Sequence, residues 1–111
     1  MPEVVEIRPS EFMKRWPSEA ERRAVVLLDV REHHELERAA LSFATHIPMA
    51  QVPARIAELD AEATIVVMCH SGMRSLQVAS FLATQGFSNM MNLTGGIDAW
   101  AREVDSTIPR Y

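Results

Sequence analysis

The chain has 111 residues, of which 48% are hydrophobic and 23% charged, and its formal net charge is -4. This length and composition are typical of one globular domain with a single core, so we expect residues 1–111 to form one domain. The negative charge argues against nucleic acid as a partner, because phosphate binding needs a basic face. No apolar run reaches the length of a membrane span, so a membrane protein is not expected either.

Short apolar runs alternate with helical patterns along the chain. In chain order we predict strand 4–7, helix 10–16, strand 24–30, helix 31–39, strand 44–48, helix 52–59, strand 64–69, helix 75–85, strand 90–93 and helix 97–104. Ser10 is expected to cap the first helix and Pro17 to stop it, whereas Pro53 suits a helix start. Residues 106–111 are expected to lie on the surface.

Two of the helical patterns indicate which face is buried. The polar segment 31–39 has Leu36 as its main inward-facing candidate. The segment 75–85 carries an apolar stripe at helical spacing, and Gly86 ends it. The stripe consists of Leu76, Ala79, Leu82 and Ala83.

The runs 24–30 and 64–69 are apolar almost throughout, which is typical of parallel strands buried on both faces. Strands separated by helices predict an α/β fold with a central parallel sheet of about four or five strands and helices on both faces. Ligands of such sheets bind beyond the carboxyl ends of the strands. Cys69 and Asp29 each stand at such an end.

Cys69, the one cysteine of the chain, lies between a predicted strand and a predicted helix. A loop at this position points backbone N–H groups into one concavity, and the following helix adds unpaired N–H groups and the positive end of its dipole. Such surroundings stabilise a thiolate, which is the nucleophilic form. Gly72 permits a tight backbone, and Arg74 adds positive charge for an anionic substrate. The competing interpretation is a small buried hydrophobic residue, although such a cysteine is more typical within a strand.

From about residue 24 to residue 100 the chain resembles the rhodanese (sulfurtransferase) domain family in its small single-domain form, and four segments carry this resemblance. LLDVRE (27–32) resembles the family's Asp-x-Arg-Glu segment and THIPMA (45–50) its His-Ile-Pro segment. VVMCHSGMRS (66–75) resembles its active-site loop and NLTGGIDAW (92–100) its closing Gly-Gly segment. The resemblance implies the three-layer rhodanese fold. Thr45 and Met49 depart from the family pattern, which usually has glycine at both positions.

The resemblance implies a thiosulfate sulfurtransferase that acts through a persulfide on Cys69. Cys69 would take the outer sulfur of a small anionic donor such as thiosulfate and pass it to cyanide or a thiol, in two half-reactions. The N–H groups of residues 70–75 would stabilise the anions, and no metal or organic cofactor is needed. The substrate-binding loop would comprise His70, Ser71, Gly72, Met73, Arg74 and Ser75.

Two alternatives remain open. Small domains of this fold also serve as interaction modules or as relays that receive sulfur from another protein. Cys69 argues against an inactive binding module, but it does not separate an enzyme from a relay. Cysteine-dependent phosphatases and arsenate reductases are the other alternative. Their pattern has five residues between cysteine and arginine, whereas four separate Cys69 from Arg74, and the resemblance implies that the shorter loop suits sulfur.

The polar residues around these strand ends have structural as well as functional interpretations. Asp29 and Arg31 either support the Cys69 loop or form a structural ion pair, and we favour the ion pair. Ser71 and Ser75 are candidate hydrogen-bond donors to the sulfur. Ser75 is equally suited to cap the next helix, and we favour the cap.

His70 is the best candidate for a general base, but a loop that points its N–H groups inward turns its side chains outward. We therefore expect His70 and Met73 at the rim of the site. The four histidines and Cys69 do not match the spacing of a zinc site. A lone thiol and no recognisable signal peptide favour the reducing cytoplasm.

Overall fold

Five parallel strands form one sheet in the computed structural model, which describes residues 3–111. In chain order they are β1 (Val4–Ile7), β2 (Val26–Asp29), β3 (Thr45–His46), β4 (Ile65–Met68) and β5 (Met90–Leu93). Their order across the sheet is β1-β5-β4-β2-β3, which places β4 at the centre. The predicted parallel sheet is confirmed.

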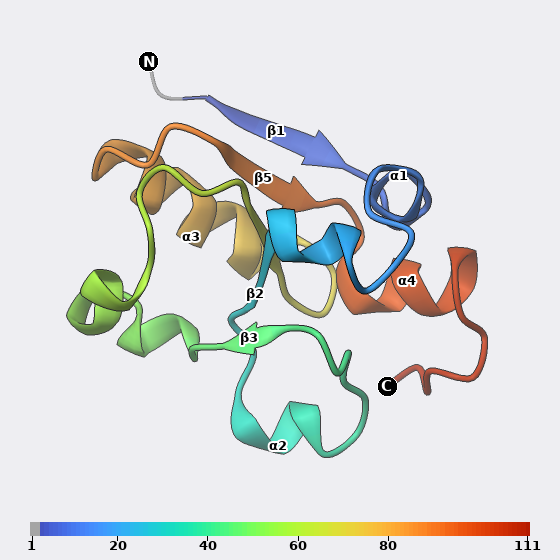
Figure 1. Ribbon diagram of the computed structural model, residues 1–111. Helices are drawn as coiled ribbons and strands as arrows, with labels where there is room; N and C mark the ends of the chain where they lie inside the picture. Colours follow the sequence, from blue (N-terminus) through green and yellow to red (C-terminus); the bar gives the residue numbers. More distant parts are fainter. Residues whose placement is uncertain (1–2) are drawn as a thin grey trace.

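Helices cover both faces of this sheet (Figure 1). α1 (Pro9–Arg15) and α4 (Gly96–Glu103) lie together on one face, and α3 (Met73–Thr84) covers the other. The short α2 (His33–Leu36) follows β2. The described residues also contain three 3-10 helices: η1 (Glu21–Ala24), η2 (Met49–Gln51) and η3 (Pro53–Glu58). The predicted three-layer α/β fold is confirmed.

Side chains of the central strands point alternately to the two faces, as the geometry of a strand requires. Leu27 and Val66 pack with α1 and α4, whereas Leu28 and Val67 pack with α3. All four are almost completely buried. Because helices cover both faces, these strands are apolar at every position rather than at every second one.

The first helix begins one residue earlier than predicted. Pro9 is its first residue and Arg8 its cap, so the prediction of Ser10 as the cap is wrong. The fixed φ and missing N–H of proline suit the first helical position, where no intrahelical partner for an N–H exists.

Two further helix predictions are wrong in extent or type. The segment 31–39 forms only the short α2, which buries Glu35 and leaves Leu36 partly exposed. Residues 53–58 are 3-10 rather than α-helical, and Arg55 leaves helical geometry with φ -114° and ψ 15°. Short segments of this kind derive their geometry from tertiary packing more than from helix propensity.

The buried face of α3 also differs from the predicted stripe. Leu76 is 41% exposed, whereas Ser75, Val78, Ala79 and Leu82 are buried. Ala79 and Leu82 were predicted correctly. The predicted stripe contained only apolar residues and so left out Ser75. A serine is buried only where its hydroxyl finds hydrogen-bond partners.

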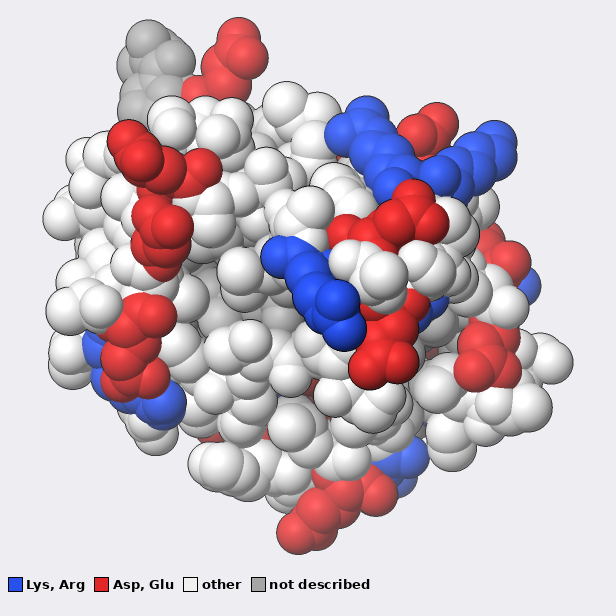
Figure 2. Space-filling view, in the orientation of Figure 1, with Lys and Arg blue, Asp and Glu red and all other residues white. Residues whose placement is uncertain are grey.

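Acidic and basic side chains lie beside one another on the face shown in Figure 2, and most of that surface carries neither charge. A continuous basic strip of the kind that binds nucleic acid is not seen on this face. Within residues 3–111, none of the helices combines the length and the apolar character that crossing a membrane demands.

The two leucines of α3 provide a matched test of this packing. Leu82→Ala is expected to lower the free energy of unfolding by about 2–5 kcal/mol, because Leu82 is fully buried between α3 and the sheet. Leu76→Ala is expected to change it by less than about 0.5 kcal/mol, as exposed positions do. Urea unfolding followed by circular dichroism measures both, and equal losses would contradict the orientation of α3.

Candidate functional site

Cys69 follows the central strand β4 directly, and residues 69–72 connect that strand to α3. Gly72 is the last residue before the helix and has φ +105°, a left-handed conformation that residues with a side chain rarely adopt. A side chain there would also press on the backbone N of Gly95, since an added Cβ would lie 3.2 Å away. The predicted strand–loop–helix setting of Cys69 is confirmed.

The first turn of α4 holds this loop in place through backbone hydrogen bonds. The N–H of Ile97 donates to the carbonyl of Cys69 at 2.9 Å, and the N–H of Asp98 donates to the carbonyl of His70 at 3.1 Å. Gly96 packs directly on the same two carbonyls, where a Cβ would clash. The carbonyls of Cys69 and His70 therefore point towards α4, which leaves N–H groups of the loop free to bond the sulfur.

Those N–H groups face the sulfur of Cys69. The N–H of Gly72 donates to Cys69 Sγ at 3.1 Å, and the Ser75 hydroxyl lies 3.3 Å from it. Burial alone would raise the pKa of the thiol, but hydrogen bonds from the Ser75 hydroxyl and three N–H groups outweigh burial. The three N–H groups belong to Ser75, Gly72 and Ser71. The pKa of Cys69 therefore lies below its ordinary value, as a nucleophilic thiol requires.

Cys69 is nevertheless only 1% exposed and borders the apolar core on the α3 face. Both sequence interpretations of this residue thus describe part of what is seen: the side chain is buried, yet its sulfur contacts hydrogen-bond donors. A reagent can reach the sulfur only if it is small or if the loop yields slightly.

Ser75 does not cap α3, so that prediction is wrong. Gly72 holds the cap position and Ser75 is the third residue of the helix, fully buried. Its hydroxyl donates to Asn92 Oδ1 at 2.5 Å and contacts the sulfur. Asn92 was not predicted as a site residue, although one signal was present: a polar residue inside the apolar run 90–93 needs partners once it is buried.

Arg74 is paired with a residue that the sequence did not indicate. Its guanidinium donates to both carboxylate oxygens of Glu35, at 2.6 and 2.9 Å. This pairing, working against burial, lowers the pKa of Glu35 to about 2 and raises the pKa of Arg74, which therefore stays charged. The positive charge predicted beside the loop is present, but Glu35 neutralises part of it.

Asp29 and Arg31 form a fully buried ion pair, with Arg31 Nη2 2.7 Å from Asp29 Oδ2. This is the structural role that we favoured. Arg31 also donates to the hydroxyl of Tyr111 at 2.8 Å, and His46 Nε2 lies 2.6 Å from the carbonyl of Arg31. The pair thus connects the end of β2 to the last residue of the chain.

The tail lies on the surface as predicted, but Tyr111 within it is only partly exposed and makes specific contacts near the site. Its hydroxyl donates to Glu35 Oε2 at 2.8 Å, and its ring stacks on His70 with centroids 4.2 Å apart and planes 12° apart. In Figure 1 the end of the chain runs back towards α2. His70 is therefore held beside Tyr111 at the rim, and Met73 projects outward with 72% exposure.

Three of the histidines make aromatic contacts, and two of these three contact each other. His33 packs edge-on against His46 with ring centroids 4.8 Å apart, while His70 stacks on Tyr111. Among residues 3–111 there is no group of three or more potential metal ligands.

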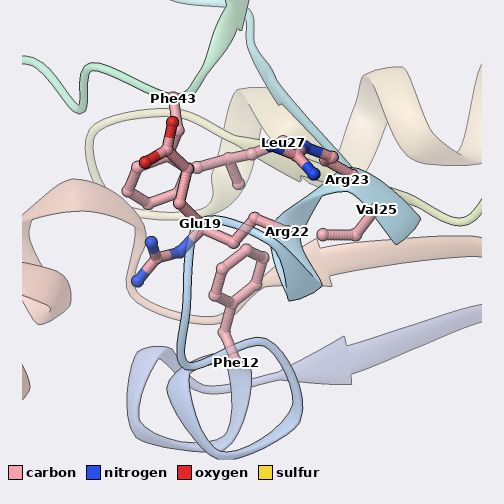
Figure 3. Close-up of a pocket in the computed structure, with 7 residues that line it drawn as sticks. All are labelled: Phe12, Glu19, Arg22, Arg23, Val25, Leu27 and Phe43. Carbon is pink, nitrogen blue, oxygen red and sulfur yellow. The ribbon is translucent and has the colours of Figure 1, made fainter.

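A second concave feature lies away from the Cys69 loop, between α1, η1 and the segment around Phe43 (Figure 3). The guanidinium carbon of Arg22 sits 4.6 Å from the centre of the Phe43 ring, which forms one wall of this cleft. Its lining contains no nucleophile and no residue of the 69–75 loop. The lining residues are Phe12, Glu19, Arg22, Arg23, Val25, Leu27 and Phe43.

Comparison with known proteins agrees with this architecture. Residues 14–103 match the rhodanese-like domain. The chain belongs to the rhodanese-like domain family. A sulfurtransferase of Allochromatium vinosum is 38% identical over 78 residues, which cover 70% of this chain and 73% of the relative. The putative sulfurtransferase YtwF of Bacillus subtilis is 35% identical over 101 residues, or 91% and 94% of the two chains.

A solved rhodanese-related protein from Thermoplasma volcanium has the same fold. It superposes with a TM-score of 0.78 at 25% identity, covering 91% of this chain and 94% of the other. The predicted family is therefore confirmed, and relatives named as sulfurtransferases support a sulfur-transferring activity for this rhodanese-like protein in general terms.

The pairing of Glu35 with Arg74 predicts how stability depends on pH. The pKa of Glu35 falls from 4.5 when unfolded to about 2 when folded, so its stabilising effect is complete above 4.5 and is lost as pH falls towards 2. Glu35→Gln is expected to cost about 2 kcal/mol of unfolding free energy at neutral pH, and this difference from the wild type should shrink in acid.

Urea unfolding at several pH values measures that difference. Glu58→Gln is a suitable control, because Glu58 pairs with Arg55 on the exposed surface and such pairs contribute little. A loss in Glu35→Gln that stays constant from neutral pH to pH 2 would contradict the role of the ionised carboxylate.

Proposed function

We propose that this rhodanese-like protein is a sulfurtransferase that carries sulfane sulfur as a persulfide on Cys69. The observation that supports this most directly is the hydrogen bonding around Cys69 Sγ: the Gly72 N–H donates to the sulfur at 3.1 Å, and the Ser75 hydroxyl lies 3.3 Å from it. Such an arrangement stabilises a thiolate. A persulfide also carries its charge as an anion, so we expect hydrogen-bond donors of the same loop to stabilise it.

The first half-reaction begins with the Cys69 thiolate, which attacks the outer sulfur of thiosulfate. A new S–S bond forms, the S–S bond of thiosulfate breaks, and sulfite leaves with the electron pair. In the second half-reaction, cyanide or a thiolate attacks the outer sulfur of the persulfide and Cys69 leaves as a thiolate. Neither step calls for a metal or an organic cofactor, and a reducing compartment such as the cytoplasm suits the free thiol.

Thiosulfate as the donor is supported by size and charge. Because Cys69 is almost completely buried, a small reagent is favoured over a bulky one. The loop N–H groups and Arg74 favour an anion, although the carboxylate of Glu35 reduces the positive charge that the anion meets.

A protein-to-protein sulfur relay is the second candidate, and one surface feature favours it. Met73 and Leu76 are the large apolar side chains of α3 with the highest exposure, 72% and 41%, and they lie in the first two turns after the Cys69 loop. Aliphatic and methionine side chains beside a reactive thiol suit contact with a protein acceptor. A transfer rate that rises when a protein partner is added would favour this candidate.

A phosphatase or arsenate reductase is less well supported. An arginine that binds phosphate uses its two-pronged donor face for the substrate. Here that face is already bound to Glu35 through both terminal nitrogens, and the carboxylate would repel a dianion.

Intact-protein mass spectrometry tests the proposed cycle. After brief incubation with thiosulfate, the reduced wild type is expected to gain one sulfur atom, because the Cys69 thiolate forms a persulfide. Cyanide should remove the added mass and release thiocyanate. Cys69→Ser should gain nothing while its circular dichroism spectrum stays that of the wild type. No gain in folded, reduced wild type would contradict thiosulfate as the donor, and an aryl phosphate assay would then test the phosphatase alternative.

Arg74→Ala tests whether the positive charge of Arg74 helps to bind the donor. The change leaves Glu35 unpaired beside the loop, so the KM for thiosulfate is expected to rise about tenfold, equivalent to about 1.4 kcal/mol, with a smaller change in kcat. The double variant Arg74→Ala, Glu35→Gln should recover part of that loss, because it removes the repelling carboxylate. Steady-state thiocyanate formation measures both, and an unchanged KM in Arg74→Ala would exclude Arg74 from donor binding.

A further inference from the structure

A chain of hydrogen bonds leads from Cys69 through two buried residues to the surface of β1. Ser75 Oγ lies 3.3 Å from the sulfur and donates to Asn92 Oδ1 at 2.5 Å. The Asn92 amide nitrogen in turn donates to both oxygens of Glu6, at 3.1 and 3.2 Å, and to the carbonyl of Gly72 at 3.1 Å. Ser75 and Asn92 are buried, whereas Glu6 is exposed.

The orientation of the Asn92 amide follows from these partners. A carboxylate and a backbone carbonyl only accept hydrogen bonds, so the end of the amide that faces Glu6 and Gly72 must be the NH2 group. The amide oxygen is then turned towards Ser75. Thr94 supports this arrangement, because its hydroxyl donates to Glu6 Oε1 at 2.7 Å.

The Ser75 hydroxyl has one hydrogen and two neighbours that compete for it. When Cys69 is a thiol, its S–H can donate to Ser75 while Ser75 donates to Asn92. When Cys69 is a thiolate, both the sulfur and the amide oxygen accept, and only one of them receives the hydrogen. A buried oxygen left without a donor is unfavourable. The amide oxygen therefore competes with the thiolate for the hydrogen bond that the Ser75 hydroxyl can donate.

We propose that Asn92 and Glu6 are positioning residues of the Cys69 site: Glu6 holds the Asn92 amide with its oxygen towards Ser75, and this oxygen limits how far the Ser75 hydroxyl stabilises the thiolate. The inference rests on the proposed function only in taking Cys69 as the reactive group. The chain orients Ser75 and does not conduct protons, because an amide does not pass a proton on at neutral pH.

Other charged groups near the loop stay unchanged in the variants that test this role. They are Arg74 of α3 with its partner Glu35 of α2, the buried Asp29–Arg31 pair after β2, and His70 with Tyr111 of the tail. Glu6 and Asn92 also line a surface groove of about 320 Å³ that passes beside Gly72. The Glu6 side chain can therefore be replaced without opening the core.

Ultraviolet absorbance of the thiolate during a pH titration tests the proposal, since the chain has one cysteine and the titration of Cys69→Ser supplies the background. Asn92→Leu removes the competing oxygen. Its thiolate midpoint is expected to fall by about half to one pH unit, a three- to tenfold change in the dissociation constant. Glu6→Ala should shift the midpoint in the same direction by less, because Gly72 still holds the amide.

Variants made in the Ser75→Ala background show whether the shift of the thiolate midpoint depends on the Ser75 hydroxyl. Ser75→Ala alone should raise the midpoint, and adding Asn92→Leu or Glu6→Ala to it should have no further effect. A lowered midpoint in both single variants that disappears in the Ser75→Ala background supports the proposal. An unchanged or raised midpoint in the single variants, or a shift that persists without Ser75, overturns it.

Folding and charge have their own controls. If circular dichroism shows that Asn92→Leu is unfolded, the single variant Glu6→Ala is compared with the double variant Glu6→Ala, Ser75→Ala. A lowered midpoint in the single variant that disappears in the double variant supports the proposal, and any other result overturns it. Glu3→Ala removes a carboxylate from the exposed residue before β1 and should leave the midpoint unchanged. Because no sulfur donor takes part in the titration, failure of the mass test with thiosulfate would contradict thiosulfate as the donor in the proposed function without affecting this result.

Discussion

Two backbone hydrogen bonds from the first turn of α4 to the carbonyls of Cys69 and His70 are the constraint on which the site depends. A loop cannot present its N–H groups to a buried sulfur unless its carbonyls find donors elsewhere, because unpaired buried backbone groups are costly. α4 supplies those donors from the otherwise unpaired N–H groups at its start. Gly96 is required at this contact, since it lies directly on both carbonyls.

A second set of contacts joins segments around the loop that are distant in the chain. Arg31 binds Asp29 and Tyr111, Tyr111 binds Glu35, and Glu35 binds Arg74. A fully buried ion pair such as Asp29–Arg31 contributes little net stability when intact, but removing one partner leaves the other charge unpaired and costs much more. The network therefore specifies one arrangement of α2, α3 and the tail.

The strands and the location of Cys69 could be predicted from local patterns, because an apolar run ending in a polar loop has few alternatives. The buried face of α3 could be predicted only in part. Leu82 has the pattern of a core residue and is one, whereas Leu76 is exposed and Ser75 takes its place. Ser75 is buried because Asn92 accepts a hydrogen bond from its hydroxyl, and no local sequence pattern indicates that partner.

The sequence by itself determined the α/β class, the family and a lone thiol at a strand end before a helix. These depend on residues close together in the chain and on the order of motifs. Only the tertiary structure decided what surrounds that thiol. Ser75 meets Asn92 17 residues away, Arg74 meets Glu35 39 residues away, and Tyr111 meets Glu35 76 residues away. Such contacts arise because parallel strands bring their carboxyl ends to one edge of the sheet, where segments that are unrelated in sequence become neighbours.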